Sequence, residues 1–193
     1  MASPTVRAVL DQLLGHWKTP PRWGMPLVTF PTPGAWDVPH LHWHTDLAVT
    51  PEPSAVARIF LLLGPSAPHG GGTGYVTGSH RALRQLARKA GRPLPSGVAR
   101  RMLKEREPWF AALESRRDGE DRSERFMVEG GVADGVPVRL AEMTGEAGDI
   151  FLMDPIILHG MTQNVARTPR LMLTEWVYGA AFDVTSASGD PEG

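Results

Sequence analysis

The 193-residue sequence contains no cysteine. This absence excludes disulfide bonds, thiolate metal sites and cysteine nucleophiles, and it leaves histidine, aspartate and glutamate as the strong metal ligands. The sequence also lacks any stretch approaching the roughly 20 apolar residues that cross a bilayer, and it shows no basic segment followed by an apolar run near residue 1. We therefore expect a cytoplasmic protein without a membrane partner.

A large charge of one sign is also lacking, because the formal net charge is only -1. The chain as a whole therefore gives no indication of nucleic-acid binding. The charge is distributed unevenly, since residues 81–125 contain 13 Arg or Lys and 7 Asp or Glu. Two interpretations stay open: these residues form solvated helix faces, or they form a basic lid that attracts an anionic small-molecule substrate.

Length and composition suit one domain. At 21.0 kDa and with 41% hydrophobic residues, the chain has enough apolar surface for a single core. We expect residues 1–182 to form this domain, with a helical lid inserted at about residues 79–125. Residues 183–193 are expected to be a disordered tail.

The first residues have the pattern of a short amphipathic helix. Ser3 is placed to cap it, and Pro4 suits the first helical position. The proline-rich residues 19–38 permit only a short strand at residues 27–30. The apolar residues at helical spacing are Val6, Val9, Leu10, Leu13, Leu14 and Trp17.

The middle of the chain has helical composition. Ser79 is expected to cap a helix, residues 91–95 interrupt the pattern, and Pro108 is expected to start a fresh helix. The glycines of residues 70–74 could suggest a phosphate loop, but no Gly-Lys-Ser/Thr follows them. We interpret them as a tight turn.

Strand patterns lie on both sides of this helical segment. Because strands and helices do not alternate, the order argues against a doubly wound sheet and for two antiparallel sheets. The predicted fold is mainly β: a double-stranded β-helix, also called a jelly roll and cupin-like, with an N-terminal helix and the helical lid. The expected strands cover residues 27–30, 40–49, 55–63, 75–76, 137–143, 149–153, 156–161 and 171–178.

His44 and Asp46 form an H-x-D triplet in one expected strand. Residues two apart in a strand share a face, so both side chains can reach one metal ion. His159, in another expected strand, would complete the set. Two histidines and one carboxylate that leave positions open are the pattern of non-heme Fe(II) oxygenases, and dioxygen binds at such positions.

His42 offers an alternative, because it shares a face with His44. We prefer Asp46 as the partner of His44, since a carboxylate partly neutralises Fe(II) and a hard oxygen ligand suits that ion. His42 is expected to support the site rather than to bind the metal.

Arg170 follows His159 across a segment rich in turn-forming residues. If residues 164–169 form a hairpin turn, pairing of His159 with Met172 places Arg170 on the face of His159. The planar guanidinium of Arg170 could then bind a carboxylate through two parallel hydrogen bonds.

In these motifs the sequence resembles the phytanoyl-CoA dioxygenase family of iron and 2-oxoglutarate-dependent oxygenases. The resemblance runs from about residue 42 to residue 178. No single motif is specific, but their order is. The motifs are His42-Trp43-His44-Thr45-Asp46-Leu47, Gly72-Thr73-Gly74-Tyr75-Val76-Thr77-Gly78-Ser79-His80-Arg81, Gly148-Asp149, and His159-Gly160 followed by Asn164 and Arg170.

The resemblance implies Fe(II) held by His44, Asp46 and His159, which are then the catalytic residues. It implies 2-oxoglutarate as co-substrate, with its distal carboxylate on Arg170, and O2 as oxidant. The reaction would hydroxylate a C–H bond of a small metabolite or of an acyl or carrier-linked intermediate, with release of succinate and CO2. Related halogenases carry a small residue in place of the metal carboxylate, so Asp46 argues for oxygen transfer.

Two departures from the family pattern leave alternatives open. Only 43 residues precede His44, so support for the sheet could come from the second subunit of a homodimer. The family often carries a hydroxyl residue, which helps to bind 2-oxoglutarate, at the second position after the histidine that corresponds to His159. Here that position is Met161, with Thr162 next, so it stays open which polar group assists Arg170. The alternative function is a catalytically inactive jelly-roll protein that retains a metal.

Overall fold

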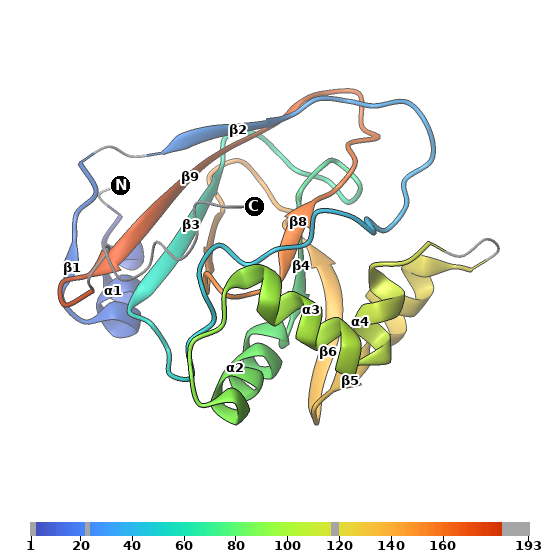
Figure 1. Ribbon diagram of the computed structural model, residues 1–193. Coiled ribbons are helices and arrows are strands. Elements are labelled where there is room, and N and C mark those ends of the chain that lie inside the picture. Colours follow the sequence, from blue (N-terminus) through green and yellow to red (C-terminus); the bar gives the residue numbers. More distant parts are fainter. Residues whose placement is uncertain (1–2, 22–23, 117–119, 183–193) are drawn as a thin grey trace.

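The structure is a computed structural model that describes residues 3–21, 24–116 and 120–182. Its strands form two antiparallel sheets, and helices lie outside both (Figure 1). The expected tail, residues 183–193, lies outside the described residues. In the described part, every helix is too short or too polar to cross a membrane.

The larger sheet has five strands. β9 is its longest strand and pairs with β1, β2 and β3, while β7 pairs with the other edge of β3. Every pairing is antiparallel. The strands are β1 (Trp17–Lys18), β2 (Met25–Thr29), β3 (Val56–Leu62), β7 (Ile150–Met153) and β9 (Arg170–Gly179).

The smaller sheet has the strand order β5-β6-β4-β8 and is also antiparallel. Its strands are β4 (Thr73–Thr77), β5 (Gly131–Ala133), β6 (Val136–Glu142) and β8 (His159–Met161). The helices are α1 (Pro4–Leu14), α2 (Ser79–Ala90), α3 (Ser96–Arg106), α4 (Pro108–Leu113) and a π-helical turn, η1 (Glu124–Glu129).

Alternation along β3 separates the two faces of the larger sheet. Ala57 and Ile59 face outward and pack with Leu10 of α1, so the N-terminal helix covers this face (Figure 1). Phe60 and Leu62 face the other way. They pack with methionines and with Tyr75 of β4 in an inter-sheet core, whose buried residues are Phe60, Leu62, Met143, Met153 and Met172.

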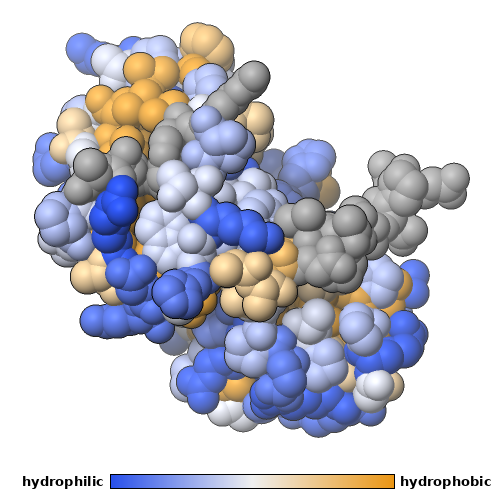
Figure 2. Space-filling model, turned by 90° about the vertical axis from the view of Figure 1, so that its left-hand side faces the viewer, coloured by the Kyte–Doolittle hydropathy of each residue, from blue (hydrophilic) through white to orange (hydrophobic). Residues whose placement is uncertain are grey.

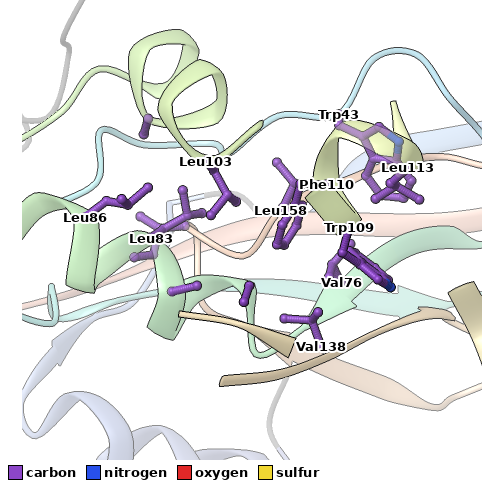
Figure 3. Packing of buried hydrophobic residues seen from close by; sticks show 14 of the residues in the cluster. Trp43, Val76, Leu83, Leu86, Leu103, Trp109, Phe110, Leu113, Val138 and Leu158 are labelled. Atoms are coloured by element: carbon purple, nitrogen blue, oxygen red, sulfur yellow. The ribbon is translucent and has the colours of Figure 1, made fainter. Parts of the chain in front are cut away.

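The smaller sheet packs its other face against α2, α3 and α4. Val76 of β4 and Val138 of β6 meet Leu83 of α2, Leu103 of α3 and Phe110 of α4 in a helix-backed core (Figure 3). Large apolar side chains dominate this core, and burying each contributes about 1.5–3 kcal/mol. The result is four layers: α1, larger sheet, smaller sheet, helices.

Most helices and strands lie where the sequence pattern predicted them. The helices at Pro4, Ser79 and Pro108 are confirmed, and strands lie at seven of the eight expected positions. Ser3 occupies the predicted N-cap position of α1, although its side chain makes no capping hydrogen bond, whereas the prediction for Ser79 was wrong, because Gly78 holds the N-cap position of α2. Its φ of 76° favours glycine, and a Cβ there would collide with the neighbouring strand. β1 and β5 were not predicted.

The strand expected at residues 40–49 is absent. The segment makes two isolated bridges, His44 with His159 and Val49 with Leu94. His42 has a φ of 63°, in the left-handed region, so the chain turns where a strand would continue.

The predicted hairpin between His159 and Arg170 was also wrong. β8 pairs with β4, placing His159 opposite Tyr75, while Arg170 in β9 lies opposite Thr29 of β2. The intervening residues cross from one sheet to the other. Asn164 holds this crossing, since its side-chain amide donates to the carbonyl of Thr29 at 2.9 Å.

Part of the outer face of the larger sheet is apolar. Val28 of β2 and its partner Leu171 of β9 are 44% and 43% exposed. Figure 2 shows the side of the molecule that is on the left in Figure 1, with hydrophobic surface gathered in its upper part.

Candidate metal centre

The three predicted metal ligands meet. Oδ1 of Asp46 lies 3.7 Å from Nε2 of His44 and 3.5 Å from Nε2 of His159. One potential ligand atom from each residue lies within 4.8 Å of the others, and in the described part of the chain this is the one such group of three. His40 and His42 do not join it.

Backbone hydrogen bonds hold the two distant segments together. His44 and His159 exchange N–H to carbonyl bonds of 3.0 Å each, and the N–H of Asp46 donates to the carbonyl of Pro155 at 2.9 Å. The irregular segment that carries His44 and Asp46 is therefore fixed to β8 and to the turn before it. These contacts replace the continuous strand that the sequence predicted.

The hydrogen bonds of the imidazoles indicate which nitrogen is free. Nδ1 of His44 lies 3.0 Å from the carbonyl of His42, and Nδ1 of His159 lies 2.9 Å from the carbonyl of Ile157. A carbonyl only accepts, so each Nδ1 carries the proton and each neutral ring directs a lone pair from Nε2. Both Nε2 atoms face Asp46, and converging lone pairs of this kind fit a metal cation.

The surroundings favour the metal-binding protonation states. Burial lowers the pKa of His44 below its ordinary value. Burial would raise the pKa of Asp46, but the contact with the imidazole of His159 and the charge of Arg58 lower it by more than burial raises it, so the net shift is downward. A neutral imidazole and an ionised carboxylate are the forms that bind metals.

The donor set also limits the choice of metal. Two imidazole nitrogens and one carboxylate oxygen fit Fe(II) and leave other positions to exogenous ligands. The side chain of His44 is 51% exposed, whereas that of His159 is 7% exposed. The centre is thus open on the His44 side.

A cavity of about 870 Å³ adjoins His44 on this open side. Arg100, from the second turn of α3, brings a positive charge to its wall. It donates to the carbonyl of Trp43 at 2.6 Å and lies 3.5 Å from Glu114. The lining residues are His42, Trp43, His44, Ser96, Gly97, Arg100 and Met161.

Arg170 is buried, with 5% of its surface exposed. Nε donates to the carbonyl of Gly71 at 2.8 Å, one terminal nitrogen donates to the hydroxyl of Thr29 at 2.5 Å, and the other lies 3.4 Å from the carbonyl of Leu27. Arg170 forms no ion pair with any acidic group in the described ranges. Burial lowers the pKa of this guanidinium.

Two residues of this region were not predicted. Thr29 contacts Arg170, whereas neither candidate after His159 does: Met161 is 73% exposed, and the hydroxyl of Thr162 lies within hydrogen-bond distance of the Gly72 carbonyl and of the Glu142 carboxylate. Nothing in the sequence around Thr29 distinguishes it. Arg58 was missed although a signal existed, because it is a charged residue within an apolar strand pattern.

Among the solved structures that match this chain are two that cover most of it. One is EctD from S. alaskensis with bound Fe, at a TM-score of 0.48 and 19% identity, covering 89% of this chain and 48% of that chain. The other is EctD from S. alaskensis with 2-oxoglutarate and 5-hydroxyectoine, at 0.48 and 18%, covering 90% and 48%. This chain thus spans about half the length of these proteins.

No protein-family model matches the chain, and no curated protein matches its sequence. Membership of the phytanoyl-CoA dioxygenase family therefore stays a prediction. The site residues themselves carry the functional argument.

Proposed function

We propose that the protein is an Fe(II)- and 2-oxoglutarate-dependent dioxygenase with a jelly-roll fold. The observation that carries this proposal is the convergence of two imidazole lone pairs and one carboxylate oxygen from His44, His159 and Asp46. Two antiparallel sheets that enclose an inter-sheet core support the fold. The reaction would hydroxylate a C–H bond of a small metabolite or of an acyl or carrier-linked intermediate, releasing succinate and CO2.

His44 and His159 would bind Fe(II) through Nε2, and Asp46 would bind it through Oδ1. Bound Fe(II) would supply a centre at which 2-oxoglutarate and dioxygen react. The hydrogen bonds of both Nδ1 atoms to backbone carbonyls hold the rings in the ligand tautomer.

Arg170 is the proposed site for the distal carboxylate of 2-oxoglutarate. Its hydrogen bonds go to neutral oxygens, so its charge has no acidic counterpart within the described residues. Two of the five N–H groups of a guanidinium remain after those three bonds. A buried cation without an anion is costly, and a bound carboxylate would offset that cost.

The substrate is proposed to be a small anion. The cavity beside His44 can hold a metabolite of modest size, and Arg100 on its wall offers an attractive charge. A second hollow of about 330 Å³ shares His42 and Met161 with this cavity and exposes Leu41 and Phe30. A substrate with an apolar part could therefore extend across Met161.

Anaerobic addition of Fe(II) and 2-oxoglutarate tests the proposed function. An oxygenase centre gives a visible iron-to-ketoacid charge-transfer band and forms succinate when air is admitted. A jelly-roll protein that retains a metal without turnover binds Fe(II) but forms no succinate above a metal-free control, and that result contradicts the proposal.

The single domain, the cytoplasmic location and the homodimer stay proposals. Light scattering of the purified protein measures its mass in solution and so tests the homodimer. A mass corresponding to one 21.0 kDa chain contradicts the homodimer.

A further inference from the structure

Arg58 places a charged group in an otherwise apolar part of the protein. It lies in β3, where Phe60 and Leu62 on the same face belong to the inter-sheet core. Its side chain is 11% exposed. None of its nitrogen atoms donates a hydrogen bond to any described residue.

The charge of Arg58 faces Asp46. Nε of Arg58 lies 3.9 Å from Oδ2 of Asp46, a distance of an ion pair rather than of a hydrogen bond. Both atoms are buried, and neither has a hydrogen-bond partner in the described part of the chain. The two orphaned groups are complementary, because one only donates and the other only accepts.

Neighbouring side chains fix the guanidinium in this place. Its central carbon lies 4.4 Å from the ring of Trp176 and 5.9 Å from the ring of Phe60, so it is held over two aromatic faces. Glu175 is a nearby acid, but its carboxylate accepts from the N–H groups of Gly24 and Trp176. Asp46 is the acid with which Arg58 pairs.

The two oxygens of Asp46 therefore have different surroundings. Oδ1 faces both imidazole Nε2 atoms, whereas Oδ2 faces Arg58. We propose that Arg58 is a positioning residue that keeps Asp46 a one-oxygen metal ligand. This inference rests on the proposed function, because a carboxylate bound through both oxygens would occupy a position needed by the co-substrate or by dioxygen.

Replacement of Arg58 by methionine tests the proposal without turnover. Co(II) is the probe, since its visible absorption reports coordination number and geometry. In Arg58→Met we expect an altered Co(II) spectrum even without 2-oxoglutarate, because Oδ2 becomes free to bind. We also expect the Co(II)-loaded variant to bind 2-oxoglutarate about 10- to 100-fold more weakly, the range by which loss of a group that orients a metal ligand lowers metal affinity or activity.

Two further variants separate this role from a structural one. Arg58→Lys keeps the charge and should move the spectrum part of the way back to that of the wild type. Arg84→Met removes another largely buried arginine from its carboxylate, that of Asp154 at 2.6 Å, and should leave the Co(II) spectrum unchanged. Thermal unfolding of each variant identifies any loss of folded protein.

The outcomes distinguish the inference from the proposed function. If the wild type binds no Co(II), the metal centre itself is refuted. If the wild type binds Co(II) and Arg58→Met has the same spectrum, the positioning role is refuted while the metal centre stands. Weaker 2-oxoglutarate binding with an unchanged spectrum would mean that Arg58 contacts the co-substrate, which also overturns the proposal.

Discussion

The inter-sheet space and the helix-backed core are both buried, yet they contain different side chains. The helix-backed core is filled by apolar residues such as Leu83, Phe110 and Leu158 (Figure 3). The inter-sheet space combines a methionine-rich core with the charges of the largely buried Arg58 and the buried Arg170. Burying a charge costs free energy unless the charge is paired and hydrogen-bonded, whereas burying apolar surface gains free energy. The helix-backed core thus contributes stability, while the proposed chemistry lies between the sheets.

This division also applies to the two segments that carry the ligands. His159 lies in the smaller sheet, whose other face is supported by the helices, and its side chain is 7% exposed. His44 lies in an irregular segment and is 51% exposed. One proposed ligand is therefore buried, while the other borders the cavity that is proposed for the substrate.

The largest expected effect is the loss of activity in Asp46→Ala. The variant loses the carboxylate whose Oδ1 lies beside Nε2 of both His44 and His159, so metal binding and succinate formation should be abolished. Circular dichroism should show a folded protein. Asp149→Asn is the matched control, because Asp149 accepts from the N–H of Glu146 in a turn outside the centre. Unchanged succinate formation by Asp46→Ala contradicts its role as a ligand.

Phe110→Ala tests the other side of the comparison. Phe110 is 1% exposed in the helix-backed core, so its truncation should lower the free energy of unfolding by about 3–5 kcal/mol. Denaturant unfolding measures this change. Val128→Ala, at a site 62% exposed, should change stability by less than about 0.5 kcal/mol. The folded fraction of Phe110→Ala should bind Co(II) with wild-type affinity, and a weaker affinity would show that the two regions are not separable.

Arg170→Ala should act on the co-substrate rather than on the metal. Charge-assisted hydrogen bonds contribute about 1.5–3 kcal/mol, so the Kd for 2-oxoglutarate should rise by roughly 10- to 150-fold. Calorimetric titration of 2-oxoglutarate into Co(II)-loaded protein measures this. Arg170→Lys keeps the charge and should lose less affinity. An unaltered affinity in Arg170→Ala contradicts its role.

The sequence predicted what depends on neighbours along the chain. The strand at β3 and the helix start at Pro108 follow from local pattern and backbone chemistry, and the spacing of His44 and Asp46 indicated a shared site. The three predicted metal ligands were named from the H-x-D triplet, from the isolated His159 and from the resemblance to the oxygenase family, because composition alone could not single them out.

Strand pairing could not be predicted in the same way. The orientation of Arg170 was predicted from a hairpin with His159, but β8 and β9 belong to different sheets. Pairing depends on contacts between residues far apart, here the hydrogen bond from Asn164 to Thr29. Arg170 nevertheless faces the interior, because Thr29 and the backbone around Gly71 accept its hydrogen bonds.

The smallest expected effect concerns Thr174, a buried residue on the inner face of β9 whose hydroxyl has no partner in the described part of the chain. Valine has nearly the same shape and no hydroxyl, so Thr174→Val should raise the free energy of unfolding by up to about 1 kcal/mol. The Kd for 2-oxoglutarate should not change. Because Thr174 shares its face with Arg170, weaker 2-oxoglutarate binding in this variant would instead assign the hydroxyl to the co-substrate and extend the polar site along β9.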